Sequence, residues 1–141
     1  MFNKHGPDRL AEWKQFREHL ETSDDPLTEV AEFWSHAPFV SPYLDSQNPS
    51  EWPDPWHLVL DNRLDDLAIT LGMLYTIKLT RRFMDADCEI HTSMLPEERH
   101  PKHFLIVDHK HVLNLKYKEV VEIEELPKTK TRLIWTKKDS L

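Results

Sequence analysis

The spacing of apolar residues changes once along this chain, close to residue 80, and that change restricts the fold more than any other feature. Before it, apolar residues recur three and four positions apart, which is the period of an amphipathic helix. After it, short segments alternate apolar and polar residues or consist of β-branched and aromatic residues, as strands do. Helices followed by strands in separate blocks indicate an α+β domain.

Two helices are expected near the N-terminus, within residues 1–36. The first spans about residues 7–20 and begins at a proline, whose fixed φ suits the first helical turn. The second spans about residues 26–35, again with a proline first, and Asp25 is its predicted N-cap. Neither helix carries a group of residues typical of a catalytic site.

The segment EWPDPWH, which begins at Glu51, predicts the start of a third and longer helix. Asp54 can accept hydrogen bonds from the free N–H groups of the first turn, and Pro55 suits the first helical position. From Pro55 we expect one continuous core helix to about Lys78, within a 55–80 segment. The apolar positions that keep the helical period are Leu60, Leu64, Leu67, Ala68, Leu71, Leu74 and Tyr75.

The β-rich part, residues 86–136, is predicted to form an antiparallel sheet of about four strands with one face packed on the helices. The tetrapeptide from Asp108 to His111 lies between two of the strand-like segments and fits a hairpin loop. The strand-like segments are residues 88–94, 104–107, 112–117, 120–126 and 132–135.

An aromatic and proline-rich loop, residues 37–54, separates the second predicted helix from the third. Its four prolines exclude a regular element, and so long a loop either carries function or packs down through its own aromatic side chains. Packing is favoured over a binding platform. If a partner binds here, the acidic residues of the loop favour a basic partner. The predicted contact residues are Phe39, Tyr43, Asp45 and Trp52.

Length and charge limit the remaining choices. A chain of 141 residues is expected to form a single domain with one core. Residues 1–75 hold 5 Lys or Arg against 14 Asp or Glu, whereas residues 76–141 hold 13 against 11. The acidic half disfavours nucleic-acid binding, which depends on cations that neutralise phosphates. Lys130 and Arg132 are the next candidates for a protein contact. No membrane span or signal peptide is recognised, so we expect a soluble, intracellular protein.

Four histidines lie within twelve residues, namely His100, His103, His109 and His111. Imidazole nitrogens and the neighbouring carboxylate of Asp108 are ligands that zinc and similar ions accept. The spacing does not by itself define a tetrahedral site, because a turn at this point orients the side chains by loop geometry. A polar hairpin tip is the favoured interpretation, and no metal ion or other cofactor is expected.

The single cysteine, Cys88, is the only candidate thiol nucleophile, with His91 or His103 as its base. Asp85 and Asp87 lie beside it in sequence, and negative charges disfavour a thiolate. We therefore expect Cys88 to be a small, partly buried residue and assign no catalytic residue. With only two glycines, the chain has no Gly-rich phosphate loop.

The run WPDPWHLVLDNRLDDLAITLGMLYTIKLT, followed by FLIVDHKHVLNLKY, resembles small uncharacterised proteins encoded by tailed bacteriophages. In these proteins a Trp-Pro-x-Pro-Trp joint leads into a core helix and then a hairpin sheet. The resemblance covers about residues 34–120, and its motif is structural rather than catalytic. It implies a location in the virion or in the host cytoplasm, but no particular activity.

The order of a core helix followed by a hairpin sheet is also similar to the core of transglutaminase-like and papain-like folds. In those folds a cysteine near the helix start faces a histidine on a following strand. The helix predicted here carries Asn62, Asp65 and Asp66 but no cysteine, while His103 or His109 could take the strand position. The resemblance implies an inactive relative whose scaffold serves binding.

Two classes of function therefore remain open. The favoured one is a non-enzymatic bacteriophage protein that binds other proteins, either as a virion or assembly component or as a factor acting on a host protein. The alternative is a metal- or thiol-dependent hydrolase or transferase that uses the His100–His111 cluster or Cys88.

Overall fold

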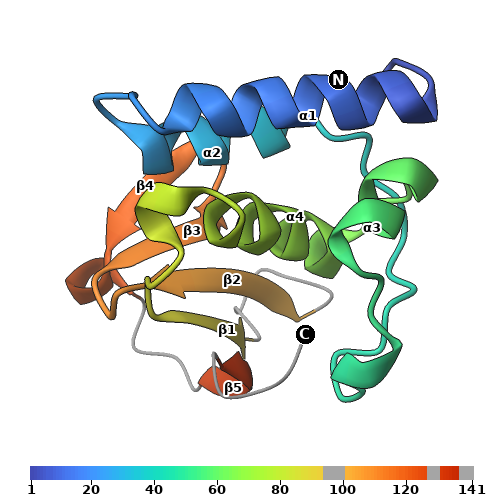
Figure 1. Cartoon of the computed structure of the whole chain (residues 1–141). Coiled ribbons are helices and arrows are strands. Elements are labelled where there is room, and N and C mark those ends of the chain that lie inside the picture. Colours follow the sequence, from blue (N-terminus) through green and yellow to red (C-terminus); the bar gives the residue numbers. More distant parts are fainter. Residues whose placement is uncertain (94–100, 127–130, 137–141) are drawn as a thin grey trace.

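The computed structural model describes residues 1–93, 101–126 and 131–136, and their architecture is α+β, as the sequence predicted. Within these residues, four α-helices precede an antiparallel sheet of five strands, close to the expected four (Figure 1). Across the sheet the strands follow the order β4-β3-β2-β1-β5. Their bounds are β1 (Cys88–Ser93), β2 (Lys102–Val107), β3 (His111–Lys116), β4 (Glu119–Glu122) and β5 (Thr131–Thr136).

The two N-terminal helices, α1 (Gly6–Leu20) and α2 (Pro26–Ser35), lie close to their predicted positions. Asp25 occupies the N-cap position of α2, as predicted, but its side chain makes no capping hydrogen bond. Its φ of −141° and ψ of 66° depart from the extended conformation in which a cap side chain reaches back over the first turn. The backbone N–H of Asp25 instead donates to Ser23 Oγ at 3.1 Å.

The predicted core helix is not continuous but consists of α3 (Pro55–Asp61) and α4 (Asp66–Lys78). Asn62 ends α3 in the left-handed conformation, with φ of 52°, which asparagine tolerates better than most residues. Its side-chain Nδ2 donates to Phe2 O at 2.9 Å, so a contact with the N-terminal segment stabilises the break. As a result, a new helix N-terminus forms in the middle of the segment predicted to be helical.

Helix α4 lies between the sheet and the two N-terminal helices (Figure 1). Every residue from 67 to 77 is buried, so α4 is surrounded by protein on all sides. A Cβ on Gly72 would lie 2.5 Å from the Trp34 indole, so only glycine fits this crossing with α2. Nearby, the indole N–H groups of Trp13 and Trp34 donate to Thr76 Oγ1 at 2.9 and 3.0 Å. None of the helices in the described residues is both long and apolar enough to span a membrane.

Strands β2 and β3 form the predicted hairpin. Asp108 and His109 have φ of 54° and 56°, as the two central residues of a tight type I′ turn require. On one face of the sheet, side chains such as Ile90 and Leu105 join the main core around α4. The other face carries a smaller cluster around Phe104 and its neighbours. The sheet therefore presents one face to α4 and brings the start of β2 to the end where α4 begins.

Candidate functional site

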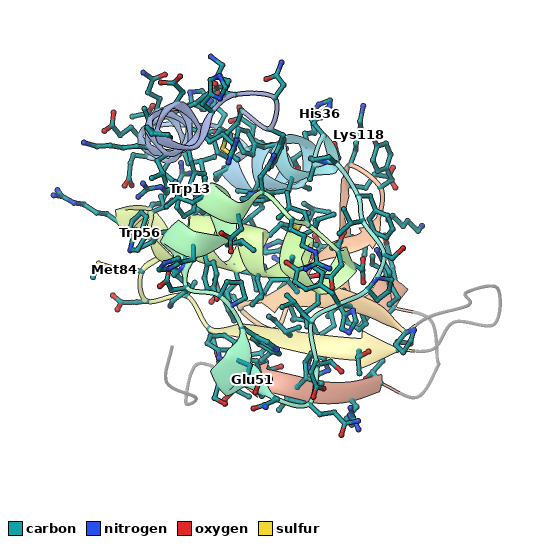
Figure 2. The ribbon with its side chains drawn as sticks, turned by 90° about the vertical axis from the view of Figure 1, so that its right-hand side faces the viewer. Trp13, His36, Glu51, Trp56, Met84 and Lys118 are labelled. Atoms are coloured by element: carbon teal, nitrogen blue, oxygen red, sulfur yellow. The ribbon has the colours of Figure 1, made fainter. Side chains whose placement is uncertain are left out.

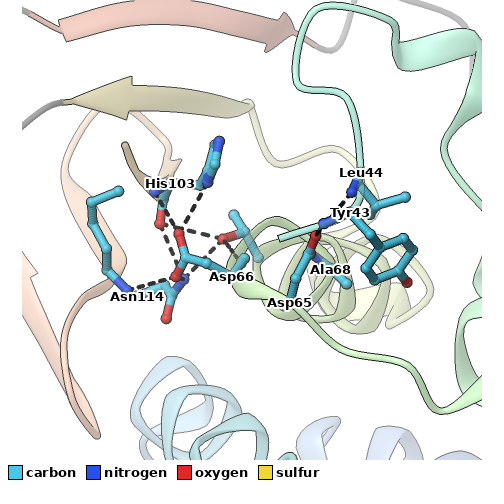
Figure 3. A network of polar contacts seen from close by, with 9 residues as sticks. Tyr43, Leu44, Asp65, Asp66, Ala68, His103 and Asn114 are labelled. Carbon is cyan, nitrogen blue, oxygen red and sulfur yellow. Dashed lines mark hydrogen bonds and ion pairs between the residues drawn. The ribbon is translucent and has the colours of Figure 1, made fainter. Parts of the chain in front are cut away.

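Asp66 is the first residue of α4, and four donors from the sheet surround its carboxylate (Figure 3). Lys102 Nζ donates to Oδ1 at 2.7 Å, and the backbone N–H of His103 donates to Oδ2 at 2.7 Å. The ring atom His103 Nδ1 lies 3.0 Å from Oδ2, and Asn114 Nδ2 lies 3.2 Å from Oδ1. Both carboxylate oxygens are therefore engaged by the protein itself.

This carboxylate is largely buried and yet remains charged. The exposed fraction of the side chain is 16% for Asp66, 13% for His103 and 23% for Lys102. Burial alone would raise the pKa of Asp66, but the hydrogen bonds from His103 and the charge of Lys102 outweigh it, so the pKa is lowered. An ionised carboxylate only accepts hydrogen bonds, so Nδ1 of His103 is the donor in this contact. The other ring nitrogen, Nε2, is buried and has no hydrogen-bond partner among the described residues.

Asn114 reaches this site because β3 bulges. The preceding residue, Leu113, packs in the core around α4, so regular alternation would turn Asn114 to the opposite face. Instead, Asn114 has φ of 68°, and the register with β4 shifts after Leu113, so both side chains face α4. Asn114 Nδ2 also lies 2.9 Å from Thr70 Oγ1 and 3.1 Å from His103 O, which ties α4, β2 and β3 together.

The neighbouring carboxylate, Asp65, holds the loop of residues 37–54 rather than the sheet. It is 2% exposed and caps α4 by accepting from Ala68 N at 2.7 Å. Its other oxygen accepts from Tyr43 N at 2.8 Å and Leu44 N at 3.0 Å. Two adjacent aspartates thus point in different directions from one helix start, Asp65 toward the loop and Asp66 toward the sheet (Figure 3).

Of the four predicted contact residues in that loop, two are held by packing. The Tyr43 hydroxyl donates to the backbone oxygen of Arg63, whose guanidinium lies 4.0 Å from the centre of the tyrosine ring. Trp52 packs against the main core, and its Nε1 donates to Asp45 O at 2.8 Å. The side chain of Phe39 is 66% exposed, and Asp45 is also exposed. The expected aromatic packing is therefore confirmed for Tyr43 and Trp52, whereas a contact with a partner stays a prediction.

The structure does not bring His103, His109 and His111 together. His109 Nε2 lies 2.7 Å from Asp87 Oδ2, and His111 Nδ1 lies 3.3 Å from Glu122 Oε1. Both belong to the hairpin at the far end of β2 from His103, and His100 lies outside the described residues. No group of three His, Cys, Asp or Glu side chains in the described part of the chain is suited to hold a metal ion.

Cys88 is buried in the core and does not face His103. In the register of β1 and β2, Cys88 lies opposite Val107, whereas Thr92 lies opposite His103. Four residues along a strand separate the two positions by about 13 Å. His91, the other base considered, instead stacks on Phe104 with ring centres 5.8 Å apart. Because Cys88 is the only cysteine in the sequence, no thiol of this chain is adjacent to His103.

Sequence reasoning placed part of this site and missed the rest. The similarity to cysteine-protease folds drew attention to Asn62, Asp65 and Asp66, but inside one continuous helix and not at a helix start. It offered His103 or His109 for the strand position, and the structure selects His103. Lys102, Thr70 and Asn114 were missed. One signal for the helix start was available, since Asp-Asp before an apolar run is typical of an N-cap. For Asn114 the only signal was an asparagine inside a strand-like segment, which strands disfavour.

Of the comparisons with known proteins, the one with solved structures supports the fold. No protein-family model matches the chain, and no curated protein matches its sequence. A calcium-bound structure of Legionella pneumophila LapG is similar, with a TM-score of 0.72 and 12% sequence identity over 92% of this chain and 75% of the LapG chain. Likeness at this identity shows the fold alone. The LapG structure has a transglutaminase-like and papain-like fold, so the fold of this chain is of the type that its order of elements suggested.

Proposed function

We propose that this chain is a non-catalytic binding protein built on a cysteine-protease-like scaffold. The observation that carries the proposal is the position of Asp66, which begins the core helix and faces His103. The resembling folds have a cysteine near this helix start, opposite a histidine. Asp66 is instead a charged carboxylate whose lone pairs are occupied by Lys102, His103 and Asn114, so it is a poor nucleophile.

The enzymatic alternative has less support. A thiol mechanism requires a cysteine within hydrogen-bond reach of its base, and Cys88 lies about 13 Å along the sheet from His103. A metal mechanism requires several converging ligands, but His103, His109 and His111 each pair with a different carboxylate.

The test of the non-catalytic function is a direct search for chemistry. We expect purified protein to leave unfolded protein and peptide substrates intact and to hold no stoichiometric metal ion. We also expect Cys88 to react slowly with a thiol reagent at neutral pH, because it is buried. Cleavage that His103→Ala abolishes, or a bound ion that His103→Ala and His109→Ala remove, would establish the enzymatic alternative instead.

An Asp66→Cys variant tests the geometry of the same site by placing a thiol where the resembling folds have their cysteine. A thiol at this position would lie beside His103 and at the N-terminus of α4, and both features favour a thiolate. We expect it to be labelled much faster than Cys88, provided that the variant melts cooperatively. Asp66→Ser is the matched control, since it changes the same position without adding a thiol. Equal labelling of all three proteins would contradict the inferred geometry.

We further propose that the partner is a protein of a bacteriophage virion or of its host. The support is the resemblance of the Trp-Pro-x-Pro-Trp joint and of the helical segment behind it to tailed-bacteriophage proteins. Mass spectrometry of purified virions tests this. Presence in the particle would indicate a virion component, and absence from it would favour a host-directed factor acting in the cytoplasm.

A further inference from the structure

Three polar side-chain atoms in neighbouring strands are buried without a hydrogen-bond partner among the described residues. They are Thr92 Oγ1 in β1, His103 Nε2 in β2 and Trp135 Nε1 in β5. Strand β1 lies between β2 and β5, so the three side chains belong to adjacent strands. A buried polar atom that lacks a partner costs free energy, so a group of three requires an explanation.

The three side chains lie on the face of the sheet that packs on α4. Thr92 lies directly opposite His103, and residues paired in this way point to the same face with Cβ atoms about 5 Å apart. His103 contacts Asp66 of α4, so this face is the one turned toward that helix. Trp135 lies opposite Ile90, two residues before Thr92, and both belong to the main core around α4. The three polar atoms therefore border one region of this face.

This region lies close to the surface of the protein. The side chain of His103 is 13% exposed, and Thr92 is only half-buried as a residue. Figure 2 looks onto this end of the molecule, where the loop of residues 37–54 runs down to Glu51. The hydrogen bonds of Asp65 tie that loop to the start of α4. A partner that contacts the loop would therefore lie close to His103.

The donors and acceptors of the three atoms define the chemistry of a ligand. Trp135 Nε1 only donates, whereas the hydroxyl of Thr92 both donates and accepts. His103 Nε2 accepts when the ring is neutral and donates when the ring is charged. A carboxamide carries N–H donors and a carbonyl acceptor, so it matches the three atoms in either state of the ring. A carboxylate or an ammonium group offers only half of this set, and burial of its charge is costly.

We infer that Thr92, His103 and Trp135 form a binding site for a primary carboxamide, the group of an asparagine or glutamine side chain of a partner protein. We call it the amide site. The inference rests on the proposed binding function and specifies the chemistry of the contact. A single water molecule fits less well, because the three side chains come from strands about 4.8 Å apart and a carboxamide presents its donor and its acceptor on separate atoms.

The test titrates acetamide into isotope-labelled full-length protein and follows the Trp135 indole N–H resonance by NMR. We expect a saturable shift with a Kd on the order of millimolar, since the ligand is so small. Acetate has a similar size but no donor, and it should give no saturable shift. Thr92→Val removes the hydroxyl and should raise the Kd for acetamide by about fivefold or more. Thr22→Val is the matched control, because Thr22 is exposed in the turn after α1 and should bind as wild type does.

The Thr92 variant should melt at the temperature of wild type, because the hydroxyl that it removes has no partner in the protein. If it does not fold, Trp135→Phe, which removes the indole donor, replaces it and is followed at the backbone N–H of His103. Loss of the acetamide shift in either variant, with Thr22→Val unchanged, would support the amide site.

The remaining outcomes would overturn the amide site or the proposed function. No shift with acetamide, an equal shift with acetate, or equal Kd values for Thr92→Val and Thr22→Val would overturn the amide site. Tighter binding of N-methylacetamide, which mimics a backbone peptide group, would replace the side chain of the partner with its main chain. Conversion of acetamide to acetate, visible in the proton spectrum, would keep the site but refute the non-catalytic function, so the two failures are distinguishable.

Discussion

The two ends of β2 each carry a histidine paired with an aspartate, and the pairs differ in burial rather than in contact distance. His103 Nδ1 lies 3.0 Å from Asp66, and His109 Nε2 lies 2.7 Å from Asp87. The side chains of the first pair are 13% and 16% exposed, whereas those of the second are 63% and 48% exposed. Water competes for the second pair but hardly for the first, so only the first should stabilise the fold appreciably. Contact distance alone therefore does not identify a site.

Removal of the buried carboxylate should have the largest effect. Asp66→Ala leaves Lys102, His103 and Asn114 without their shared acceptor in a largely buried site, so we expect a loss of about 3–5 kcal/mol in the free energy of unfolding. Asp87→Ala is the control at the exposed end and should cost less than about 1 kcal/mol. Urea unfolding at neutral pH measures the free energy of unfolding of both variants. Similar losses in the two variants would contradict the inferred difference between the buried and the exposed pair.

Asp65 sharpens the comparison, since it is buried but accepts only from uncharged backbone groups. Asp65→Ala leaves the N–H groups of Ala68, Tyr43 and Leu44 without an acceptor and should cost about 2–3 kcal/mol. The matched control is Asp54→Ala, which removes the exposed cap of α3 and should cost about 1 kcal/mol. Hydrogen exchange at Tyr43 and Leu44 should accelerate in the Asp65 variant alone. Unchanged exchange would show that something other than Asp65 holds the loop.

The charge of Asp66 should also appear in the pH dependence of stability. Its pKa in the folded protein is lowered by His103 and Lys102 despite burial, so its stabilisation is complete above the pKa of an unfolded aspartate, about 4. It is then lost as pH falls from there through the folded pKa. The difference in stability between wild type and Asp66→Asn should therefore shrink as pH falls below about 4. A difference that grows on acidification would mean that Asp66 is protonated in the folded protein.

Sequence periodicity predicted those helices and strands whose buried face is determined by the apolar pattern of their own segment. Helices α1 and α2 and the five strands follow apolar patterns within their own segments, so their positions were accessible without tertiary information. The break between α3 and α4 was not, because Leu64 keeps the helical spacing across it. What ends α3 is a left-handed Asn62 held by the backbone of Phe2, a contact sixty residues away in the chain. Without knowledge of that contact, the local sequence pattern predicts one continuous helix.

The sequence could predict a residue of the site only where regular strand alternation determines which face of the sheet its side chain is on. His103 keeps the alternation of β2 and points toward α4 beside Asp66, as a strand pattern allows. Asn114 departs from the alternation of β3 through its bulge, which no spacing in the sequence reveals. His103 and His109 are only six residues apart, but strand register places them at opposite ends of β2. The apparent histidine cluster was therefore a product of proximity in sequence.

The smallest effect is expected at the exposed pair, and it is the sharpest check on the role of burial. His109 has φ of 56°, so His109→Asn removes the contact with Asp87 and keeps a residue that tolerates this turn conformation. The turn retains its other links, because Asp87 N donates to Asp108 Oδ1 at 2.9 Å and Asp108 N donates to Asp87 O at 2.6 Å. We expect the free energy of unfolding, measured in urea, to change by less than about 0.5 kcal/mol. A cost above about 1 kcal/mol would mean that the short His109–Asp87 contact stabilises the fold although both side chains are exposed to water. Burial would then not explain why the contact between His103 and Asp66 is the more important one.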